Sequence, residues 1–259
     1  MDETLIRAVH GTRDYYGLDG TRYDKVVALG GELFARYGYA RIRTPVFEKT
    51  ELFARSIGEA TDIVEKEMYT FTPGSESITL RPENTAGVMR AYLQHNMGQQ
   101  GGLVKLWYEG PMFRRERPQK GRYRQFHQIG IEAVGSVDPL LDAEVIAAGP
   151  RCYEYVGVGE VGLRLNSIGC NRPECRPLYR QLLRDAVQPN LDKHCKNCQA
   201  RLERNALRTT DCKNPPGQEL NQGLPTSHEN PGPECGDPFE RAKDALDASG
   251  GHAERDPAL

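Results

Sequence analysis

Apolar and polar residues alternate along this chain with two different periods. In the segment 21–37 the apolar residues recur at helical spacing and form one stripe: Tyr23, Val26, Val27, Gly30, Phe34 and Tyr37. Such a stripe predicts an amphipathic helix that packs on a sheet or on a partner. Gly38 is placed to end the helix, and 39–45 follows as a short strand, because Pro45 suits a strand end or edge.

Two hairpins follow in the pattern. Segments 69–71 and 77–80 flank a turn at 72–76 that is rich in Pro, Gly and Ser, which predicts the first hairpin. Pro82 is placed to open a helix that reaches about Asn96. Segments 103–109 and 124–134 predict the second hairpin. Antiparallel hairpins with helices between them, and no repeating βαβ unit, indicate an α+β fold.

The second half of the chain gives a weaker pattern. Asp138 and Pro139 predict a capped helix start, and Pro150 is expected to end or kink that helix. The segment 163–167 alternates like a half-buried strand. Residues 214–238 are rich in Pro, Gly, Asn and Glu and read as a linker or variable insertion. Residues 239–248 predict one short helix.

Composition narrows the functional classes. With 259 residues and a net charge of −2, the chain is long enough for one large domain or two smaller ones. The charge argues against nucleic-acid binding through the whole surface, so any RNA contact needs a local basic patch. No apolar run is long enough to span a bilayer, and residues 1–10 lack the apolar core of a signal peptide, which predicts a soluble, cytoplasmic protein without membrane contact.

One basic patch lies between the strands of the second hairpin. Six cationic residues fall between Arg114 and Arg124, with Glu116 as the only acid. A basic run of this kind is often a solvated turn. At the mouth of a hairpin, however, the sheet would fix the backbone of Arg114, and a planar guanidinium there can hold a phosphate in a bidentate fork.

Four segments, in order, resemble one family. The run 113–132, FRRERPQKGRYRQFHQIGIE, resembles motif 2 of the class II aminoacyl-tRNA synthetases, and its ending is similar to that of the histidyl-tRNA synthetases. His10-Gly11-Thr12-Arg13-Asp14 resembles the N-terminal signature of that family. Segments 37–39 and 43–48 resemble motif 1, which forms the dimer. The run 79–85, TLRPENT, resembles the loop that holds the substrate amino group.

This resemblance implies a fold, a reaction and partners. The fold would be a class II synthetase-like antiparallel β-sheet flanked by helices. The reaction would join histidine to ATP, which comes with Mg²⁺, to form histidyl-adenylate and then transfer the histidyl group to tRNA-His, in a homodimer built through motif 1. Both steps gather negative charge, so positioning and electrostatics would carry most of the catalysis.

The resemblance also assigns residues. Arg114 would be the catalytic clamp on the α-phosphate and the substrate carboxylate. The predicted ATP contacts are Arg114, Glu116, Arg122 and Phe126, with Glu116 two residues after Arg114 on the same strand face. The predicted histidine contacts are Glu83, Asn84, Thr85, Arg114, Gln128 and Glu132. Read without the family, Glu132 is a surface carboxylate.

Alternation along 127–132 supports part of this assignment. Gln128, Gly130 and Glu132 would share one strand face, with glycine leaving room for a ligand. His127 would point the other way and is expected to be structural. Asn84 stands where many relatives carry glycine, and a left-handed backbone would suit either residue.

Seven cysteines, all from Cys152 onward, fit reduced thiols or a metal site better than a disulfide framework. Unliganded thiols are one interpretation. The other is structural zinc, because Cys195 and Cys198 have a two-residue spacing that suits chelation. The ligand set predicted in that case is Cys175, Cys195, Cys198 and Cys212.

The predicted organisation is a catalytic core at 1–213, the linker at 214–238, and a short helix with a truncated end at 239–259. By the resemblance, the sheet would be incomplete at its C-terminal end, and motif 3 and the anticodon-binding domain would be absent. An incomplete, weakly active or inactive ligase is therefore one hypothesis. A synthetase-like regulatory subunit that binds histidine without aminoacylating tRNA is the alternative, although such a sensor has no need of an ATP clamp. A pure RNA-binding module fits the charge balance less well.

Overall fold

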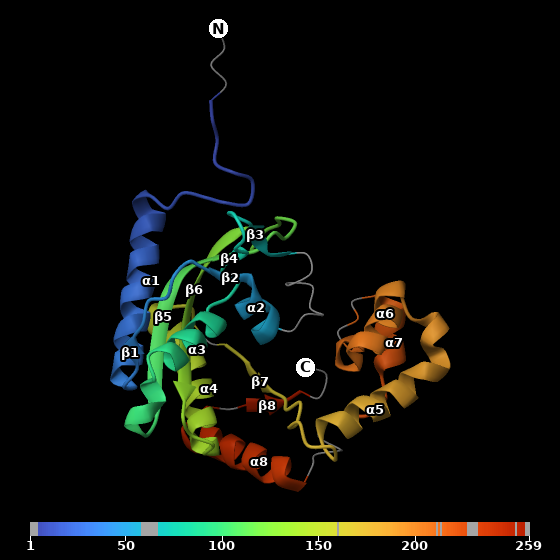
Figure 1. Ribbon diagram of the computed structural model, residues 1–259. Coiled ribbons are helices and arrows are strands. Elements are labelled where there is room, and N and C mark those ends of the chain that lie inside the picture. The colour runs from blue at the N-terminus through green and yellow to red at the C-terminus, as the bar shows by residue number, and fades with distance from the viewer. Residues whose placement is uncertain are drawn as a thin grey trace. The chain divides into compact units, whose positions relative to one another are not determined.

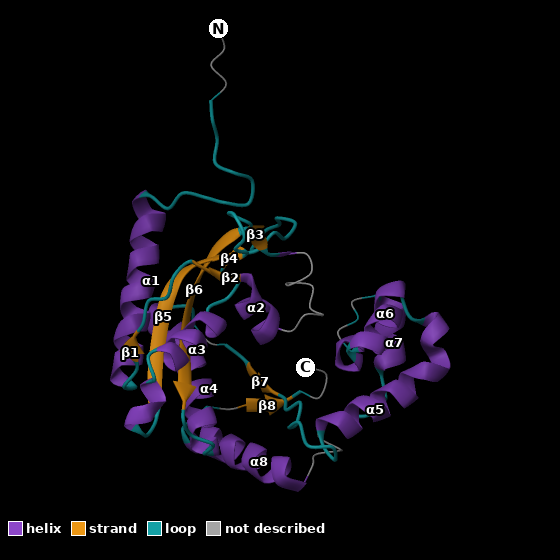
Figure 2. Ribbon diagram, in the orientation of Figure 1, coloured by secondary structure: helices purple, strands orange, loops and turns teal. Residues whose placement is uncertain are grey.

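The computed structural model describes residues 5–57, 67–159, 161–210, 212, 214–226, 233–251 and 253–256. The chain divides into two compact units. The first unit comprises Met1–Ser136 with Arg151–Gly159, and the second comprises Val137–Pro150 with Glu160–Leu259. Figure 1 labels the elements of both units, and Figure 2 separates helices from strands. Helices and small sheets, mostly antiparallel, make up an α+β fold, as the sequence predicts.

The first unit contains the predicted hairpins and helices. Its helices are α1 (Gly17–Arg36), α2 (Thr50–Ile57), α3 (Thr85–Gln94) and the 3-10 turn η2 (Met97–Gln100). Its strands are β1 (Ala40–Arg41), β2 (Phe47–Lys49), β3 (Tyr69–Phe71), β4 (Ile78–Leu80), β5 (Val104–Phe113) and β6 (Gln125–Val134). The predicted strand at 39–45 is thus reduced to two residues, which pair with β5.

Two sheets organise this unit. The larger has the order β1-β5-β6, with β1 parallel to β5 and β5 antiparallel to β6 over ten residue pairs from Val104↔Val134 to Phe113↔Gln125. The smaller has the order β2-β4-β3 and is antiparallel throughout, which confirms the hairpin around 72–76. Each ladder satisfies backbone groups that burial would otherwise leave unpaired.

The two faces of the β5–β6 pair are distinct. On one face Trp107 lies against Gly31 of α1, where an added Cβ would come within 2.7 Å of the indole. On the same face Ile129 lies against Gly30. The glycines let α1 approach the sheet, and Figure 1 shows α1 running along the two strands. On the opposite face Leu106, Tyr108 and Met112 form a buried cluster with Val88 of α3.

The second unit begins just before α4 (Pro139–Val156) and contains this helix as far as Pro150. Asp138 caps the first turn of α4 by accepting a 3.1 Å hydrogen bond from the Leu140 amide. The unit continues with β7 (Leu163–Leu165), α5 (Arg176–Val187), η3 (Gln188–Lys193), α6 (Lys196–Arg204), η4 (Ala206–Thr209), α7 (Pro215–Asn221), α8 (Pro233–Ala248) and β8 (Ala253–Arg255). Strands β7 and β8 are parallel. A small core contains Tyr179, Leu183, Val187, Leu202 and Ala206.

Two local predictions need correction. Helix α4 continues past Pro150, so of the two effects expected of this proline, ending the helix is wrong. The segment 214–238 is not a structureless linker where it is described, because α7 begins at Pro215 and α8 at Pro233. Pro215 and Pro233 each stand in the first turn of their helix, where a missing backbone N–H costs little. Prolines that were interpreted as loop residues therefore begin helices. Residues 227–232 lie outside the described residues.

None of the helices in the described part of the chain combines the length and the apolar character needed to cross a membrane.

Candidate functional site: a carboxylate recess beside an arginine

One face of β6 meets the start of α3. Tyr108 of β5 pairs with Gly130 of β6, and an added Cβ at residue 130 would come within 2.6 Å of the Tyr108 hydroxyl and Cζ. The glycine expected to leave room for a ligand therefore makes room for a tyrosine. The Tyr108 hydroxyl is hydrogen-bonded to the side chain of Thr85, the first residue of α3.

Two carboxylates lie at the same place. The Thr85 hydroxyl donates to Glu132 Oε1 at 2.7 Å. Glu83 lies just before α3, and its Oε1 and Oε2 accept from the Ala86 amide at 3.1 and 3.3 Å, which caps the helix start. Negative charge is favourable at the positive end of a helix. We call Glu83, Thr85, Tyr108 and Glu132 the carboxylate recess.

Two groups of the carboxylate recess, Tyr108 and Glu132, have raised pKa values. Burial raises the pKa of Tyr108 to about 12, with further contributions from Glu132 and Glu83. Burial also raises the pKa of Glu132 above its usual range, and the charge of Glu83 adds to this, while the hydrogen bond from Thr85 opposes it. In the described part of the chain neither carboxylate forms an ion pair. Two acids that share a half-buried site without a cation suit a cationic ligand.

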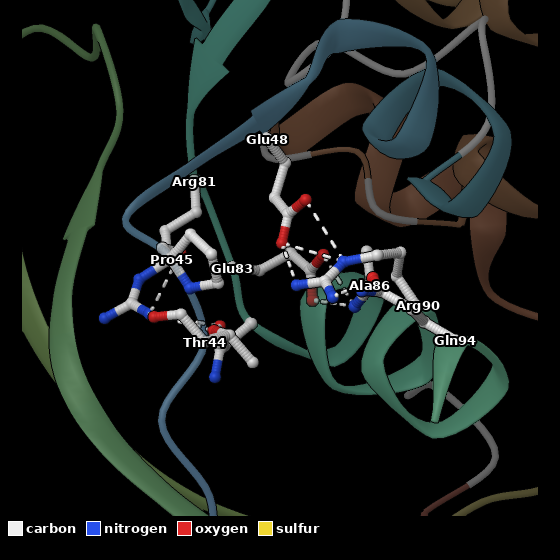
Figure 3. Close-up of polar contacts among 9 residues, drawn as sticks. Thr44, Pro45, Glu48, Arg81, Glu83, Ala86, Arg90 and Gln94 are labelled. Carbon is white, nitrogen blue, oxygen red and sulfur yellow. Dashed lines mark hydrogen bonds and ion pairs between the residues drawn. The ribbon is translucent and has the colours of Figure 1, made fainter. Parts of the chain in front are cut away.

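A buried network fixes the loop that carries Glu83. Arg81 is only 5% exposed. Its Nε donates to the Pro111 carbonyl at 2.9 Å, and its Nη1 donates to the Thr44 carbonyl at 3.2 Å and to Asn84 Oδ1 at 3.3 Å. Figure 3 shows Arg81 reaching toward Thr44 and Pro45. This guanidinium joins the segment before β2, the end of β4 and strand β5.

Asn84 belongs to this network and differs from its prediction. Its backbone has φ −120° and ψ −9°, which is not left-handed. Its side chain is buried, and its Oδ1 accepts from Thr44 Oγ1 at 2.6 Å as well as from Arg81. We therefore interpret Asn84 as a residue that positions Glu83 and Thr85.

A second contact holds α3 in place. Arg90 Nε donates to both carboxylate oxygens of Glu48 in β2, at 3.1 and 3.2 Å, and Arg90 Nη1 donates to Gln94 at 2.9 Å. Figure 3 shows this fork between β2 and the helix. Since both side chains are mostly buried, the pair orients the helix start that bears Thr85.

Arg114 lies one residue beyond β5. Its backbone amide donates to the Arg124 carbonyl at 2.9 Å, so the strand pairing does fix its backbone, as expected. Its Nε donates to the Pro82 carbonyl at 2.9 Å, and its guanidinium lies 5.1 Å from the centroid of the Phe126 ring. The guanidinium of Arg114 therefore lies over the Phe126 ring, which was predicted to stack on the purine of ATP.

Glu116 lies beyond the end of β5 and not on a strand, so the strand-face argument for it is wrong. The structure still brings it near its predicted neighbours, because Arg122 Nη1 lies 3.4 Å from Glu116 Oε2 and Arg114 Nη1 lies 4.0 Å from Glu116 Oε1. In this arrangement the loop arginines share one carboxylate. A nucleotide that binds here would compete with Glu116 for both cations.

The N-terminal signature contacts the base of this loop. The carbonyl of Gly11 accepts from the backbone amide of Arg124 at 2.7 Å and from that of Gln125 at 3.3 Å. An added Cβ at Gly11, whose φ is +88°, would come within 2.8 Å of Arg124 Cγ. The segment around Gly11 therefore braces the start of β6.

Residues 127 and 128 lie on opposite faces of β6. Gln128 lies on the Gly130 face and pairs with Gly110. His127 contacts the rings of Tyr15 and Tyr23, whose centroids are 5.4 and 4.8 Å away, and burial lowers its pKa. The orientation expected for His127 is confirmed.

The cysteines form two groups and not one. Cys195, Cys198 and Cys212 lie together, whereas Cys175 lies with Cys170 and Cys235. The predicted set of four is therefore wrong in including Cys175. Cysteine spacing along the chain does not reveal that Cys175 pairs with Cys235, 60 residues later, at 3.5 Å.

Sequence patterns missed Tyr108, Arg81 and Arg124 as parts of the site. Tyr108 read as one more apolar strand residue, yet it stands directly opposite Gly130, so the register of the hairpin would have revealed the pair. Arg81 lies in the run 79–85, in which roles were predicted for Glu83, Asn84 and Thr85 only. The guanidinium of Arg81 donates to carbonyl groups of two distant segments, Thr44–Pro45 and Pro111, and no local sequence pattern shows these contacts.

Comparisons with known proteins show which family this chain resembles. The family model described as histidyl-tRNA synthetase matches residues 11–225. A histidine–tRNA ligase of Desulforamulus reducens is 51% identical over 247 residues, which are 95% of this chain and 58% of that protein. This chain thus spans less than two thirds of the length of the curated relatives it matches.

Two solved structures are also similar. The apo histidyl-tRNA synthetase of S. aureus has a TM-score of 0.75 and 34% identity over 98% of this chain and 57% of its own. A Bacillus halodurans protein described as an ATP phosphoribosyltransferase regulatory subunit/histidyl-tRNA synthetase has a TM-score of 0.69 at 17% identity, covering all of this chain and 69% of its own, and shows likeness of fold alone. The family match, the relatives and the ordered motifs together show that this chain belongs to the histidyl-tRNA synthetase family.

Proposed function

We propose that this chain is the N-terminal catalytic portion of a histidine–tRNA ligase, which activates histidine with ATP to histidyl-adenylate and transfers it to tRNA-His. The observation that carries the proposal is the carboxylate recess. Glu83 and Glu132 lie beside the hydroxyls of Thr85 and Tyr108, and within the described residues no cation neutralises them. An amino acid supplies that cation as its ammonium group.

Histidine would bind with its polar groups shared among these residues. Glu83, Thr85 and Glu132 accept from the ammonium and imidazole N–H groups, and Gln128 contributes hydrogen bonds from the same strand face. Arg114 takes the carboxylate. The Arg81 network holds the loop in place before the ligand arrives, which lowers the ordering cost of binding.

ATP would bind on the loop side. The Arg114 guanidinium clamps the α-phosphate as the substrate carboxylate attacks phosphorus and pyrophosphate leaves. Arg122 binds a second phosphate, and Glu116 accepts from the adenine amino group once its arginine partners turn to the phosphates. Adenine stacking on Phe126 requires the same turn of Arg114. Mg²⁺ arrives with ATP and takes most of its ligands from phosphate oxygens and water.

The remaining properties concern the whole protein. We propose a cytoplasmic homodimer built through the motif 1 segments 37–39 and 43–48, with tRNA-His as partner. We keep a catalytic core within 1–213, replace the predicted linker and short end by the helices α7 and α8, and expect the relatives' further length to complete the pocket. This chain alone should therefore have little or no activity.

A second candidate function needs only the carboxylate recess and not the basic loop. A regulatory subunit would bind histidine in the same recess without activating it. Arg114, Arg122 and Glu116 favour the ligase, because a histidine sensor has no use for a nucleotide clamp. Histidine binding without any effect of ATP would favour the sensor.

The test combines binding with exchange. Calorimetry on this chain should detect histidine binding that Glu132→Gln weakens and that Glu76→Gln, at an exposed acid outside the recess, leaves unchanged. The exchange of labelled pyrophosphate into ATP is then measured on a fusion of this chain to the C-terminal part of a curated relative. Histidine-dependent exchange in the fusion supports the ligase. Histidine binding without exchange would contradict it, and full exchange in the short chain would contradict the expected incompleteness.

A further inference from the structure

The second unit holds six of the seven cysteines, in two groups of three. One group consists of Cys195, Cys198 and Cys212, and we call it the thiol triad. Its three sulfur atoms all lie within 4.8 Å of one another. Cys195 precedes α6, Cys198 lies in its first turn, and Cys212 follows η4.

The triad is built into the interior of a small helical module. Cys198 is 1% exposed and Cys212 is 5% exposed. Gly217 in α7 packs so closely that an added Cβ would come within 2.4 Å of Cys212 Sγ. Three consecutive segments therefore meet at the sulfur atoms: the start of α6, the end of η4 and the first turns of α7.

The spacing of the sulfur atoms fits a tetrahedral metal. A centre with metal–sulfur bonds of about 2.3 Å separates its sulfurs by about 3.8 Å. Cys195 Sγ and Cys212 Sγ are 4.0 Å apart. That distance is about twice the length of a disulfide bond, so the triad already has the separation of a metal site.

Cys195 directly precedes α6, and the backbone N–H groups of Cys198 and Asn197 are directed at its sulfur. A sulfur that receives amide N–H groups is a good metal ligand, because the same groups orient it and stabilise its negative charge.

The module consists of short helices. Helices α6 and α7 have nine and seven residues, and η4 has four. Helices this short are marginal by themselves, and α6 and η4 contribute one residue each to the five-residue core, whose other three members belong to α5. Small units of this kind commonly rely on a metal or disulfides for stability.

We propose that Cys195, Cys198 and Cys212 bind one structural Zn²⁺ ion that fastens α6, η4 and α7 together. The inference is independent of the ligase reaction, because the triad lies in the second unit and the residues proposed for catalysis lie in the first. The ion serves folding and not chemistry.

His194 is our candidate for the fourth ligand. No His, Asp or Glu among the described residues lies within 4.8 Å of all three sulfurs. His194 directly precedes Cys195, is 4% exposed, and its Nδ1 has no hydrogen-bond partner in the described structure. A buried imidazole nitrogen without a partner is costly unless it finds one, and reorientation toward zinc would provide it.

The second group serves as the internal comparison. Cys170 and Cys175 lie close together in sequence just before α5, whereas Cys235 lies in α8, 60 residues after Cys175. Serine substitutions there test whether any bound metal belongs to the triad or to this other group.

The experiment measures metal content on the purified 259-residue chain, prepared with reductant and dialysed against trace zinc. We expect Cys198→Ser and Cys212→Ser to lose one equivalent of zinc per chain relative to the unsubstituted protein. Cys175→Ser and Cys152→Ser should retain that equivalent. Substitution with Co²⁺ should give thiolate-to-cobalt absorption bands that disappear with the same two triad variants.

A second variant separates metal loss from misfolding. Cys195→His keeps a zinc ligand, so it should retain the equivalent and the fold while the cobalt bands shift. A chelator should lower the thermal midpoint of the unsubstituted chain and leave that of Cys198→Ser unchanged. Equal zinc content in all variants, loss of the equivalent only with Cys175→Ser, or a Cys195–Cys212 disulfide in the purified chain would each overturn the proposal.

Discussion

Arg114 Nε donates a hydrogen bond to the carbonyl oxygen of Pro82 at 2.9 Å. Pro82 directly precedes Glu83, so this bond joins the base of the basic loop to the segment that carries the carboxylate recess. The residue proposed for the α-phosphate and the residue proposed for the substrate ammonium are thus positioned by one contact. A substitution that displaces Arg114 should therefore also shift the segment that carries Glu83, and a substitution that displaces this segment should shift Arg114.

Arg114→Ala should reduce histidine-dependent pyrophosphate exchange by about 100- to 1,000-fold in the fusion described above, since a preorganised cation at the developing charge is lost. Arg114→Lys should recover only a small part, because lysine cannot make a bidentate fork. Arg115→Ala is the matched control, because its side chain is exposed on the same loop. A loss of exchange in Arg115→Ala equal to that in Arg114→Ala would contradict the assignment.

Histidine binding should weaken as the pH falls through the raised pKa of Glu132. The recess binds a cation best when Glu132 is ionised, and burial together with Glu83 moves its protonation above the usual carboxylate range. Titration calorimetry at several pH values gives the slope. Glu132→Gln should remove this part of the pH dependence and leave the part due to histidine's own imidazole. An unchanged pH slope in the variant would count against Glu132 as a ligand.

Glu132→Gln should also make the chain slightly more stable at neutral pH. The pKa of the Glu132 carboxyl is raised in the folded state, so folding disfavours its ionised form. The resulting loss of folding stability is present above the pKa that Glu132 has in the unfolded chain, and it disappears as the pH falls below that pKa. Differential scanning calorimetry should show a midpoint higher by up to about 3 °C at pH 7 and no gain near pH 3. A lower midpoint at pH 7 would mean that the carboxylate stabilises the fold.

Gly130→Ala should destabilise the first unit by about 1–3 kcal/mol, because the new Cβ overlaps Tyr108. Displacing Tyr108 should also weaken histidine binding through Thr85. Gly149→Ala is the control, because this α4 glycine has nothing within 4 Å of an added Cβ, and alanine there should be neutral or stabilising. Chemical denaturation of both variants compares them directly.

Arg81→Lys should cost about 2–4 kcal/mol in unfolding free energy. Lysine cannot reach the carbonyls of Pro111 and Thr44 together, so buried acceptors would lose their donor. Arg55→Lys, at an exposed position of α2, should change stability by less than about 0.5 kcal/mol. Similar losses in both variants would show that the buried network contributes little.

Local patterns predicted what depends on neighbours in sequence. The stripe at 21–37 predicted α1, the turn residues at 72–76 predicted the β3–β4 hairpin, and the Asp138 cap fixed the start of α4. The resemblance to a family then assigned Glu83, Thr85 and Glu132 to one site, and the structure joins Thr85 to Glu132 by a hydrogen bond.

What failed depends on contacts between distant segments. Asn84 is turned inward because Thr44 and Arg81 lie behind it, and Cys175 joins Cys235 across 60 residues. Prolines at 215 and 233 were read as loop markers because composition alone does not distinguish a helix's first turn from a loop. Only burial of the following turns decides between the two.

The parallel pairing of Leu163–Leu165 with Ala253–Arg255 brings together two segments that are far apart in the sequence. The described residues between them form the α-helices α5 to α8 and the 3-10 helices η3 and η4. The helices α5 to α8 therefore belong to one long connection that starts and ends at the β7–β8 pair. Parallel neighbours need a crossover of a dozen or more residues, so a tight turn cannot replace this connection, but its interior is free to lengthen or shrink. Related chains can differ widely there in size and still register the same two strands.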